Sequence, residues 1–239
     1  MKDEIIAKLK KLLKKLLYGQ SKNIGWSKKE LIIILSITTF SLGILFLILK
    51  LLNLDIIYSA IFLDVGFFII ILPVFFYFFK KKKYSLFPSG ISFKWFFVSF
   101  LLGLFVVIVG GGLSELLSGF LNIEKSSINK QLLSDNLWLN ILQFKIVASL
   151  LVPITEELIF RGLIFKFIRQ HKGFIFSVII SSLVFSVLHF SLEMLPFTFV
   201  LGVVTAFAFE KTNSLVYPIL IHMLVNGLAS SILLYSSIV

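Results

Sequence analysis

The stretch "IIYSAIFLDVGFFIIILPVFFYFF", residues 56–79, is almost wholly apolar, with Asp64 as its one charged residue. An apolar run of about 18 residues or more predicts a membrane-crossing helix, because about 20 helical residues span the hydrocarbon core. Such runs recur, and 58% of the 239 residues are hydrophobic while only 15% are charged. Their continuity and length exclude the alternating strands of a membrane β-barrel. The sequence therefore predicts an all-α fold, a polytopic transmembrane helical bundle.

We expect about seven spans in one continuous membrane domain, without internal repeats. They are predicted at residues 30–52, 56–79, 93–118, 140–168, 174–191, 195–210 and 214–236. Before them, lysines fill one face of an amphipathic pattern whose apolar positions are Ile5, Leu9, Leu12, Leu13, Leu16 and Leu17. This pattern is typical of an interfacial helix on an anionic leaflet. A solvated helix that packs on the protein's own loops is the alternative.

The positive charge of the chain borders the predicted spans. The net charge is +11, and lysines crowd residues 1–29, recur at 80–83 and around 169–172, and include Lys211. Lysine and arginine are enriched in cytoplasmic loops, so we expect a multi-pass protein of a cell membrane, a bacterial plasma membrane, with a cytoplasmic N-terminus. The same placement favours anionic lipids of the cytoplasmic leaflet over nucleic acid as partners. The absence of cysteine excludes disulfides, thiolate metal sites and a cysteine nucleophile.

The fourth predicted span contains two adjacent carboxylates within "ITEELIFR". Glu157 and Arg161 are four residues apart, which predicts an ion pair on one helix face. Glu156 is rotated by about 100° from Glu157 and needs another partner. Pro153 removes a helical hydrogen bond and frees the carbonyl of Ser149, so we expect a kink beside the acids.

Two later spans carry further polar side chains at four-residue spacing. Phe185 precedes His189 in one span, and His222 precedes Asn226 in the last. At about 1.5 Å per residue, Glu156 and Asn226 lie about 18 Å from the cytoplasmic ends of their spans, His189 about 23 Å and His222 about 12 Å. One buried histidine or ion pair alone is most often structural. Three motifs at compatible depths favour a site, because ionisable groups within a membrane are costly.

Together, "EELIFR", "FSVLH" and "HMLVN" fit the motifs E-E-x-x-x-R, F-x-x-x-H and H-x-x-x-N in order along the chain. This combination resembles the CPBP family of intramembrane proteases, an Abi-like family. It includes CAAX-processing endopeptidases and bacterial members linked to bacteriocin maturation and self-immunity. The similarity covers roughly residues 140–235. We accordingly divide the chain into a basic amphipathic segment, scaffold transmembrane helices and a CPBP-like catalytic core, at residues 1–29, 30–136 and 137–239.

The resemblance implies hydrolysis of a peptide bond in a membrane-associated peptide or protein. It implies that Glu156 and His189 hold and deprotonate a water, and that His222 and Asn226 stabilise the oxyanion. The supporting residues are then Glu157, Arg161 and Phe185. The family is often labelled a metalloprotease family, and a zinc ion would take Glu156, His189 and His222 as ligands. We favour no metal and no other cofactor, because no H-E-x-x-H helix supplies paired ligands.

Other functions stay open at this point. A non-catalytic immunity or partner-binding membrane protein on the same scaffold has no need of these motifs. A small transporter with a proton relay usually shows the repeat symmetry that this chain lacks. Serine catalysis by Ser186 lacks a G-x-S-x-G elbow. Asp64 and Glu115 are expected to form helix–helix hydrogen bonds or to lie near the interface. We expect a bacterial role in peptide processing or immunity.

Overall fold

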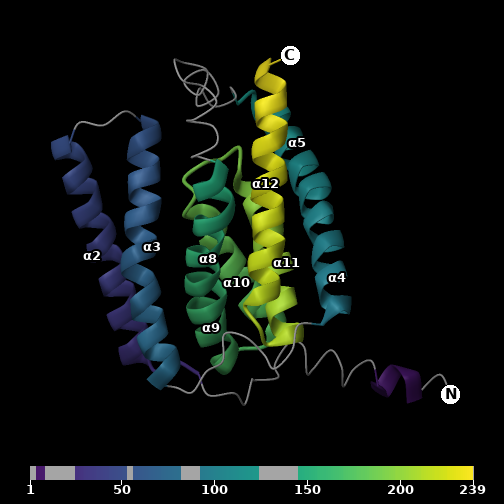
Figure 1. Ribbon diagram of the computed structural model, residues 1–239. Helices are drawn as coiled ribbons and strands as arrows, with labels where there is room; N and C mark the ends of the chain where they lie inside the picture. Colours follow the sequence, from purple (N-terminus) through teal and green to yellow (C-terminus); the bar gives the residue numbers. More distant parts are fainter. Residues whose placement is uncertain (1–3, 9–24, 53–55, 82–91, 124–144, 239) are drawn as a thin grey trace.

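The computed structural model describes residues 4–8, 25–52, 56–81, 92–123 and 145–238, and its elements in these ranges are helical (Figure 1). The predicted all-α bundle is confirmed. The elements are α2 (Lys28–Leu52), α3 (Ile56–Lys81), α4 (Phe93–Phe105), η1 (Val106–Gly110), α5 (Gly111–Leu121), η2 (Val147–Leu151), α8 (Val152–Glu157), η3 (Leu158–Phe165), α9 (Lys166–His171), α10 (Phe174–Val187), α11 (Leu195–Thr212) and α12 (Val216–Ile238). The segments labelled η are π-helical.

Four helices in the described ranges are long and apolar enough to cross a membrane: Lys28–Leu52, Tyr58–Lys81, Phe93–Leu121 and Leu195–Thr212. The third joins α4, η1 and α5 end to end. Within the predicted span 140–168, the described residues are continuously helical from residue 145 and form η2, α8, η3 and α9 in succession. Of the predicted N-terminal amphipathic helix, residues 4–8 are helical and exposed, and the following part lies outside the described residues.

The predicted span 174–191 is too long, because α10 ends at Val187. The chain then turns, and Phe190 has a left-handed backbone with a φ of 50°. Ser186 Oγ donates a hydrogen bond of 2.6 Å to the carbonyl of Leu195, at the first residue of α11. This bond ties the two ends of the turn together and sets the direction of α11.

The helices form three groups side by side, with α2 and α3 on one flank, α4 and α5 on the other, and α8 to α12 between them (Figure 1). Helices α10 and α11 pack very closely at Gly202. A Cβ added there would lie 2.8 Å from Ser182 Cβ and 2.9 Å from its Cα. Only glycine allows this approach, so the close packing of α10 on α11 depends on it.

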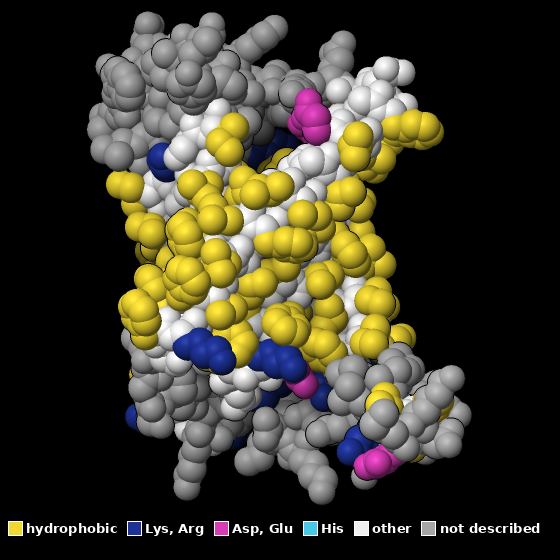
Figure 2. All heavy atoms as spheres, turned by 90° about the vertical axis from the view of Figure 1, so that its right-hand side faces the viewer, with side chains coloured by type: hydrophobic (Ala, Val, Ile, Leu, Met, Phe, Trp, Pro, Cys, Tyr) yellow, Lys and Arg dark blue, Asp and Glu magenta, His cyan; other side chains and the backbone are white. Residues whose placement is uncertain are grey.

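The lysines Lys28, Lys80, Lys81, Lys94, Lys172 and Lys211 lie at or near helix ends that meet at one end of the bundle, called here the lysine-rich end. On the face formed by α4, α5 and α12, apolar side chains make a broad belt with lysine or arginine along its lower margin (Figure 2). An apolar belt with basic residues at its edge is the surface expected of a membrane-embedded bundle.

The start of α2 is fixed by a capping box between Ser27 and Glu30. The backbone N–H of Ser27 donates to Glu30 Oε2 (2.9 Å), and that of Glu30 donates to Ser27 Oγ (3.2 Å). Directly before it, Trp26 Nε1 donates to the carbonyl of Gly162 in η3 (2.6 Å). The buried indole packs against the aromatic rings of Phe75, Phe78 and Phe79 on α3. Trp26 therefore joins the beginning of α2 to the helix that carries the two glutamates.

Candidate active site

The carboxylate of Glu157 is fully buried in the bundle, with 0% exposed. Arg161 Nε lies 3.2 Å from Glu157 Oε2, so the ion pair predicted from their spacing is present. His222 Nδ1 lies 2.9 Å from Glu157 Oε1. Arg161 Nη2 also donates to the carbonyl of Gly202 (3.1 Å). Glu157 thus connects the α8–η3 segment to α12, and Arg161 connects it to α11.

Glu156 is rotated by about 100° from Glu157 on the same helix and approaches His222 at the opposite ring nitrogen. Glu156 Oε2 lies 3.6 Å from His222 Nε2. Because the carboxylate of Glu157 only accepts hydrogen bonds, the Nδ1 of His222 carries the proton in this contact. His222 Nε2 is therefore the nitrogen that faces Glu156. The sequence left the partner of Glu156 undecided, and the structure supplies His222.

His189 shares a cavity of about 340 Å³ with Glu156. It follows the end of α10, and its Nδ1 lies 2.8 Å from the carbonyl oxygen of Phe185. A carbonyl only accepts, so this contact places the proton on Nδ1 and leaves Nε2 as an acceptor. The opposite wall of the cavity belongs to α2 and α3, through Leu35, Thr38, Thr39, Leu42 and Phe67. No sequence pattern indicated that α2 contributes to the site.

The buried ring of Phe185 stands between the polar groups of the site. Its centroid lies 4.7 Å from that of His189 and 5.8 Å from that of His222, and both pairs are edge-to-face. The guanidinium carbon of Arg161 lies 4.7 Å from the same centroid. A cation over an aromatic face is stabilised by the ring quadrupole. Phe185 therefore holds both imidazoles and the arginine in fixed relative positions.

Asn226 lies one turn beyond His222 on α12 and is held by the backbone of η2. Its Nδ2 donates to the carbonyl of Ala148 (2.9 Å). The π register explains this contact, because each N–H then bonds the carbonyl five residues earlier, as that of Val152 bonds Val147. Pro153 has no N–H, so the helix leaves the carbonyl of Ala148 unbonded. The prediction of a free carbonyl at Ser149 assumed α-helical counting and stays a prediction.

The described side chains around Glu156 do not form a metal site. Within the described ranges, no three of histidine, cysteine, aspartate and glutamate are arranged to hold one ion. The predicted ligand set of Glu156, His189 and His222 lacks a common centre in this geometry. We therefore derive no step through zinc.

Three other residues singled out in the sequence have separate surroundings. Ser186 bonds across the turn that joins α10 to α11, and its Oγ also accepts a hydrogen bond from Thr198 Oγ1 (2.9 Å). Glu115 is on an exposed face of α5. Asp64 is half-buried on α3 and close enough to Glu156 for their charges to interact. Its spacing from Phe67 and the buried Ile71 places it on the core-facing stripe of α3, a signal that was present in the sequence.

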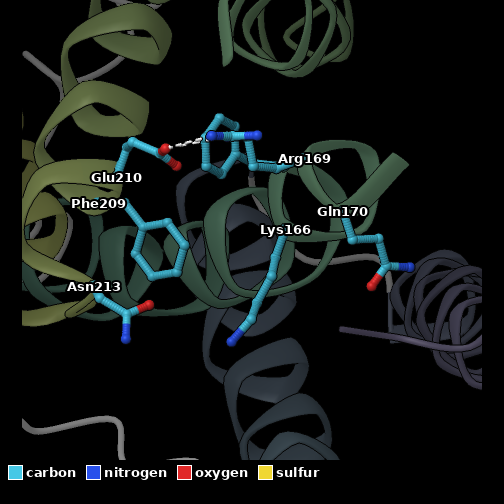
Figure 3. Close-up of a pocket in the computed structure, with 7 residues that line it drawn as sticks. Lys166, Arg169, Gln170, Phe209, Glu210 and Asn213 are labelled. Atoms are coloured by element: carbon cyan, nitrogen blue, oxygen red, sulfur yellow. Dashed lines mark hydrogen bonds and ion pairs between the residues drawn. The ribbon is translucent and has the colours of Figure 1, made fainter. Parts of the chain in front are cut away.

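A second, smaller cavity of about 90 Å³ lies at the lysine-rich end, between α9 and α11 (Figure 3). Arg169 Nη2 and Glu210 Oε1 form an ion pair of 2.9 Å in its wall. Gln170 points away from Phe209, towards the beginning of α2, where its Nε2 donates to the carbonyl of Trp26 (2.6 Å). These contacts lock the end of α9 to its neighbours, and the cavity is separate from Glu156 and His189.

Comparisons with known proteins agree with this arrangement. Residues 138–228 match the family model of the type II CAAX prenyl endopeptidase Rce1-like proteins. The chain is similar to YdiL of Bacillus subtilis (strain 168), a candidate membrane peptidase by name, with 31% identity over 137 residues, 57% of this chain and 54% of YdiL. It is similar to the membrane-embedded CAAX protease MroQ of Staphylococcus aureus (strain USA300), with 37% identity over 90 residues, 35% of this chain and 36% of MroQ. No solved structure matches it.

The fold and site define a class of protein, the polytopic helical membrane proteins with carboxylates and imidazoles gathered beside a cavity. Within this class, residues 138–228 are similar to the Rce1-like type II CAAX prenyl endopeptidases, in line with the resemblance carried by the three sequence motifs. The chain spans about half the length of YdiL and about a third of that of MroQ. The boundaries of the three predicted segments stay a prediction.

Proposed function

We propose that the protein is an intramembrane endopeptidase that hydrolyses a peptide bond of a membrane-associated peptide or protein. The observation that carries the proposal is the placement of Glu156, which lies 3.6 Å from His222 and shares a cavity with His189. A carboxylate beside two imidazoles in an apolar cavity suits general-base activation of a water. The membrane-embedded CAAX protease MroQ, similar over 90 residues, supports the same reaction class.

In this proposal, Glu156 and the Nε2 of His189 hold the attacking water. Its oxygen bonds to the peptide carbonyl carbon while Glu156 takes its proton, and Glu156 later returns a proton to the leaving nitrogen. His222 donates from Nε2 to the oxyanion once it is protonated, and the charge of Glu157 at 2.9 Å stabilises that imidazolium. Asn226 uses one amide hydrogen on Ala148 and has a second for the oxyanion.

The walls of the cavity suit an apolar substrate. Its lining is mainly Leu, Ile and Phe side chains from α2, α3, η3 and α10. Such a lining favours a peptide segment that enters from the membrane over a charged, water-soluble one. We further propose that the protein lies in a cell membrane with its N-terminus and lysine-rich end in the cytoplasm, where anionic lipids are its partners. A role in bacteriocin maturation, other peptide processing or self-immunity fits this activity.

The test compares Glu156→Gln with Glu115→Gln, a matched control on α5. Both proteins are reconstituted in lipid vesicles with internally quenched apolar peptides. Glu156→Gln keeps the side-chain shape and removes the base, so cleavage is expected to fall about 100-fold or more. The control is expected to cleave at the wild-type rate. Equal cleavage by Glu156→Gln and wild type contradicts the assignment, and no cleavage by any variant supports a partner-binding membrane protein instead.

A further inference from the structure

Polar groups line the contact of α12 with η2 and the residues just before it, and of these the proposed reaction uses only Asn226. At the end of the bundle opposite the lysine-rich end, Lys145 Nζ donates to Ser231 Oγ (2.6 Å). About one turn deeper, Gly227 lies beside Ser149: a Cβ added at Gly227 would be 4.0 Å from Ser149 Oγ. Beside it, Asn226 bonds the carbonyl of Ala148. We call Lys145, Ser149, Asn226 and Ser231 the polar seam, which runs down α12 to His222.

Ser149 is the informative member of the polar seam. Its side chain is 8% exposed, and its Oγ has no hydrogen-bond partner among the described residues. Several serines and threonines within the spans satisfy their hydroxyls on their own helix, as Thr38 does by donating to the carbonyl of Ile34 (2.7 Å), whereas Ser118 and Ser182 share the unpartnered state of Ser149. A buried hydroxyl without a partner is unfavourable in a bundle surrounded by lipid. Ser149 is therefore placed to bond a small polar molecule lying between η2 and α12.

The same helix presents a second unpartnered oxygen at the inner end of the seam. Glu156 Oε2 is buried and has no hydrogen-bond partner among the described residues. His222 Nε2 lies 3.6 Å from it. Seven residues separate Ser149 from Glu156, which is about 10 Å along a helix. Both oxygens face α12, one towards Gly227 and the other towards His222. The two unpartnered oxygens thus lie on one side of a helix, and Asn226 lies on α12 between the residues that they face, Gly227 and His222.

We propose that the polar seam admits water to Glu156 from the membrane face opposite the lysine-rich end. Hydrolysis consumes one water for each peptide bond, and the substrate cavity has largely apolar walls. Water bonds readily to buried polar groups that lack a protein partner. The seam then supplies water to Glu156 from one side of the site, while the substrate occupies the cavity on the other side. Its use in hydrolysis rests on the function proposed above, but its hydration does not.

The test exploits the absence of cysteine from the chain, which makes each introduced thiol unique. Ser149→Cys is compared with Leu150→Cys, its neighbour at the same depth, whose side chain is 45% exposed on the outside of the bundle. Full-length variants in membrane vesicles of both orientations are treated with a charged methanethiosulfonate that does not cross lipid. Ser149→Cys is expected to react about tenfold or more faster than Leu150→Cys, because only a hydrated thiol ionises. The reaction should require reagent on the face opposite the lysine-rich end.

A second pair repeats the comparison near the mouth of the seam, with Ser231→Cys as the probe and Ile232→Cys, 57% exposed, as its control. Equal labelling of Ser149→Cys and Leu150→Cys overturns the proposal, and so does labelling from the lysine-rich side alone. Labelling needs no catalysis, so the two proposals fail separately. A protein that cleaves peptides while Ser149→Cys stays unlabelled refutes the seam alone. Labelling without cleavage refutes only the peptidase function.

Discussion

The buried ion pair of Glu157 and Arg161 permits a quantitative prediction. Arg161 is 1% exposed and Glu157 is 0% exposed, so water does not screen the pair. Replacing Arg161 with Met keeps most of the side-chain volume and leaves a charged carboxylate in the core. Removing one partner of a buried pair typically costs 3–5 kcal/mol of unfolding free energy, and we expect about 3 kcal/mol here. The lower end applies because His222 Nδ1 still donates to Glu157.

The assay is thermal unfolding in nanodiscs, followed by tryptophan fluorescence and by the fraction of protein that stays monodisperse. A loss of about 3 kcal/mol corresponds to a fall of about 6–12 °C in Tm for a chain of this length. Glu157→Gln is the second single variant, since it removes the charge and keeps an acceptor for His222. The double variant Glu157→Gln/Arg161→Met removes both charges together. Its loss should be smaller than the sum of the single losses by about 0.5–3 kcal/mol.

Two results would refute this reasoning. One is a Tm of Arg161→Met within about 2 °C of the wild type, which corresponds to less than about 1 kcal/mol. The other is strict additivity in the double variant, because residues that share a buried charge contact must be coupled. Either result would show that the two charges do not depend on each other for burial.

Two further predictions concern packing and use the same unfolding assay. Trp26→Phe keeps an aromatic ring on α3 but loses the hydrogen bond to Gly162, so we expect a Tm lower by about 2–4 °C, for about 1 kcal/mol; an unchanged Tm would contradict the bond. Gly202→Ala places a methyl group against the backbone of Ser182, which should cost about 1–3 kcal/mol of stability. Gly112→Ala is its control, since nothing lies within 4 Å of the added Cβ, and a similar loss in both variants would contradict the close packing of α10 on α11.

Local spacing allowed part of the site to be predicted. The ion pair of Glu157 and Arg161 follows from a four-residue separation, which places two side chains on one face of any helix. The divergence of Glu156 from Glu157 follows from the same geometry. The contact of both carboxylates with His222 on α12 does not follow from spacing, because spacing within one helix says nothing about the rotation of another. Depth estimates placed His222 about 6 Å from the level of Glu156, whereas tilt and packing bring their side chains to 3.6 Å.

The π-helical register of η2 and η3 had no signal in the sequence. In this register the carbonyl five residues before Pro153 is that of Ala148, and Asn226 donates a hydrogen bond to it. The shortness of α10 was also missed, because apolar residues continue past Val187 while the backbone turns at Phe190. Both features depend on contacts with α11 and α12, which a local pattern cannot encode.

By itself, the sequence determined that this protein is a helical bundle suited to a membrane, because long apolar runs leave no other way to satisfy their backbone groups in lipid. It also placed a carboxylate, two imidazoles and an amide on three late helices. Only the tertiary structure decided that His222 stands between the two glutamates, that α2 closes the cavity opposite Glu156 and His189, and that η2 and α12 meet along polar groups. The physical reason is that these contacts join helices whose relative rotation and tilt are set by side-chain packing between them.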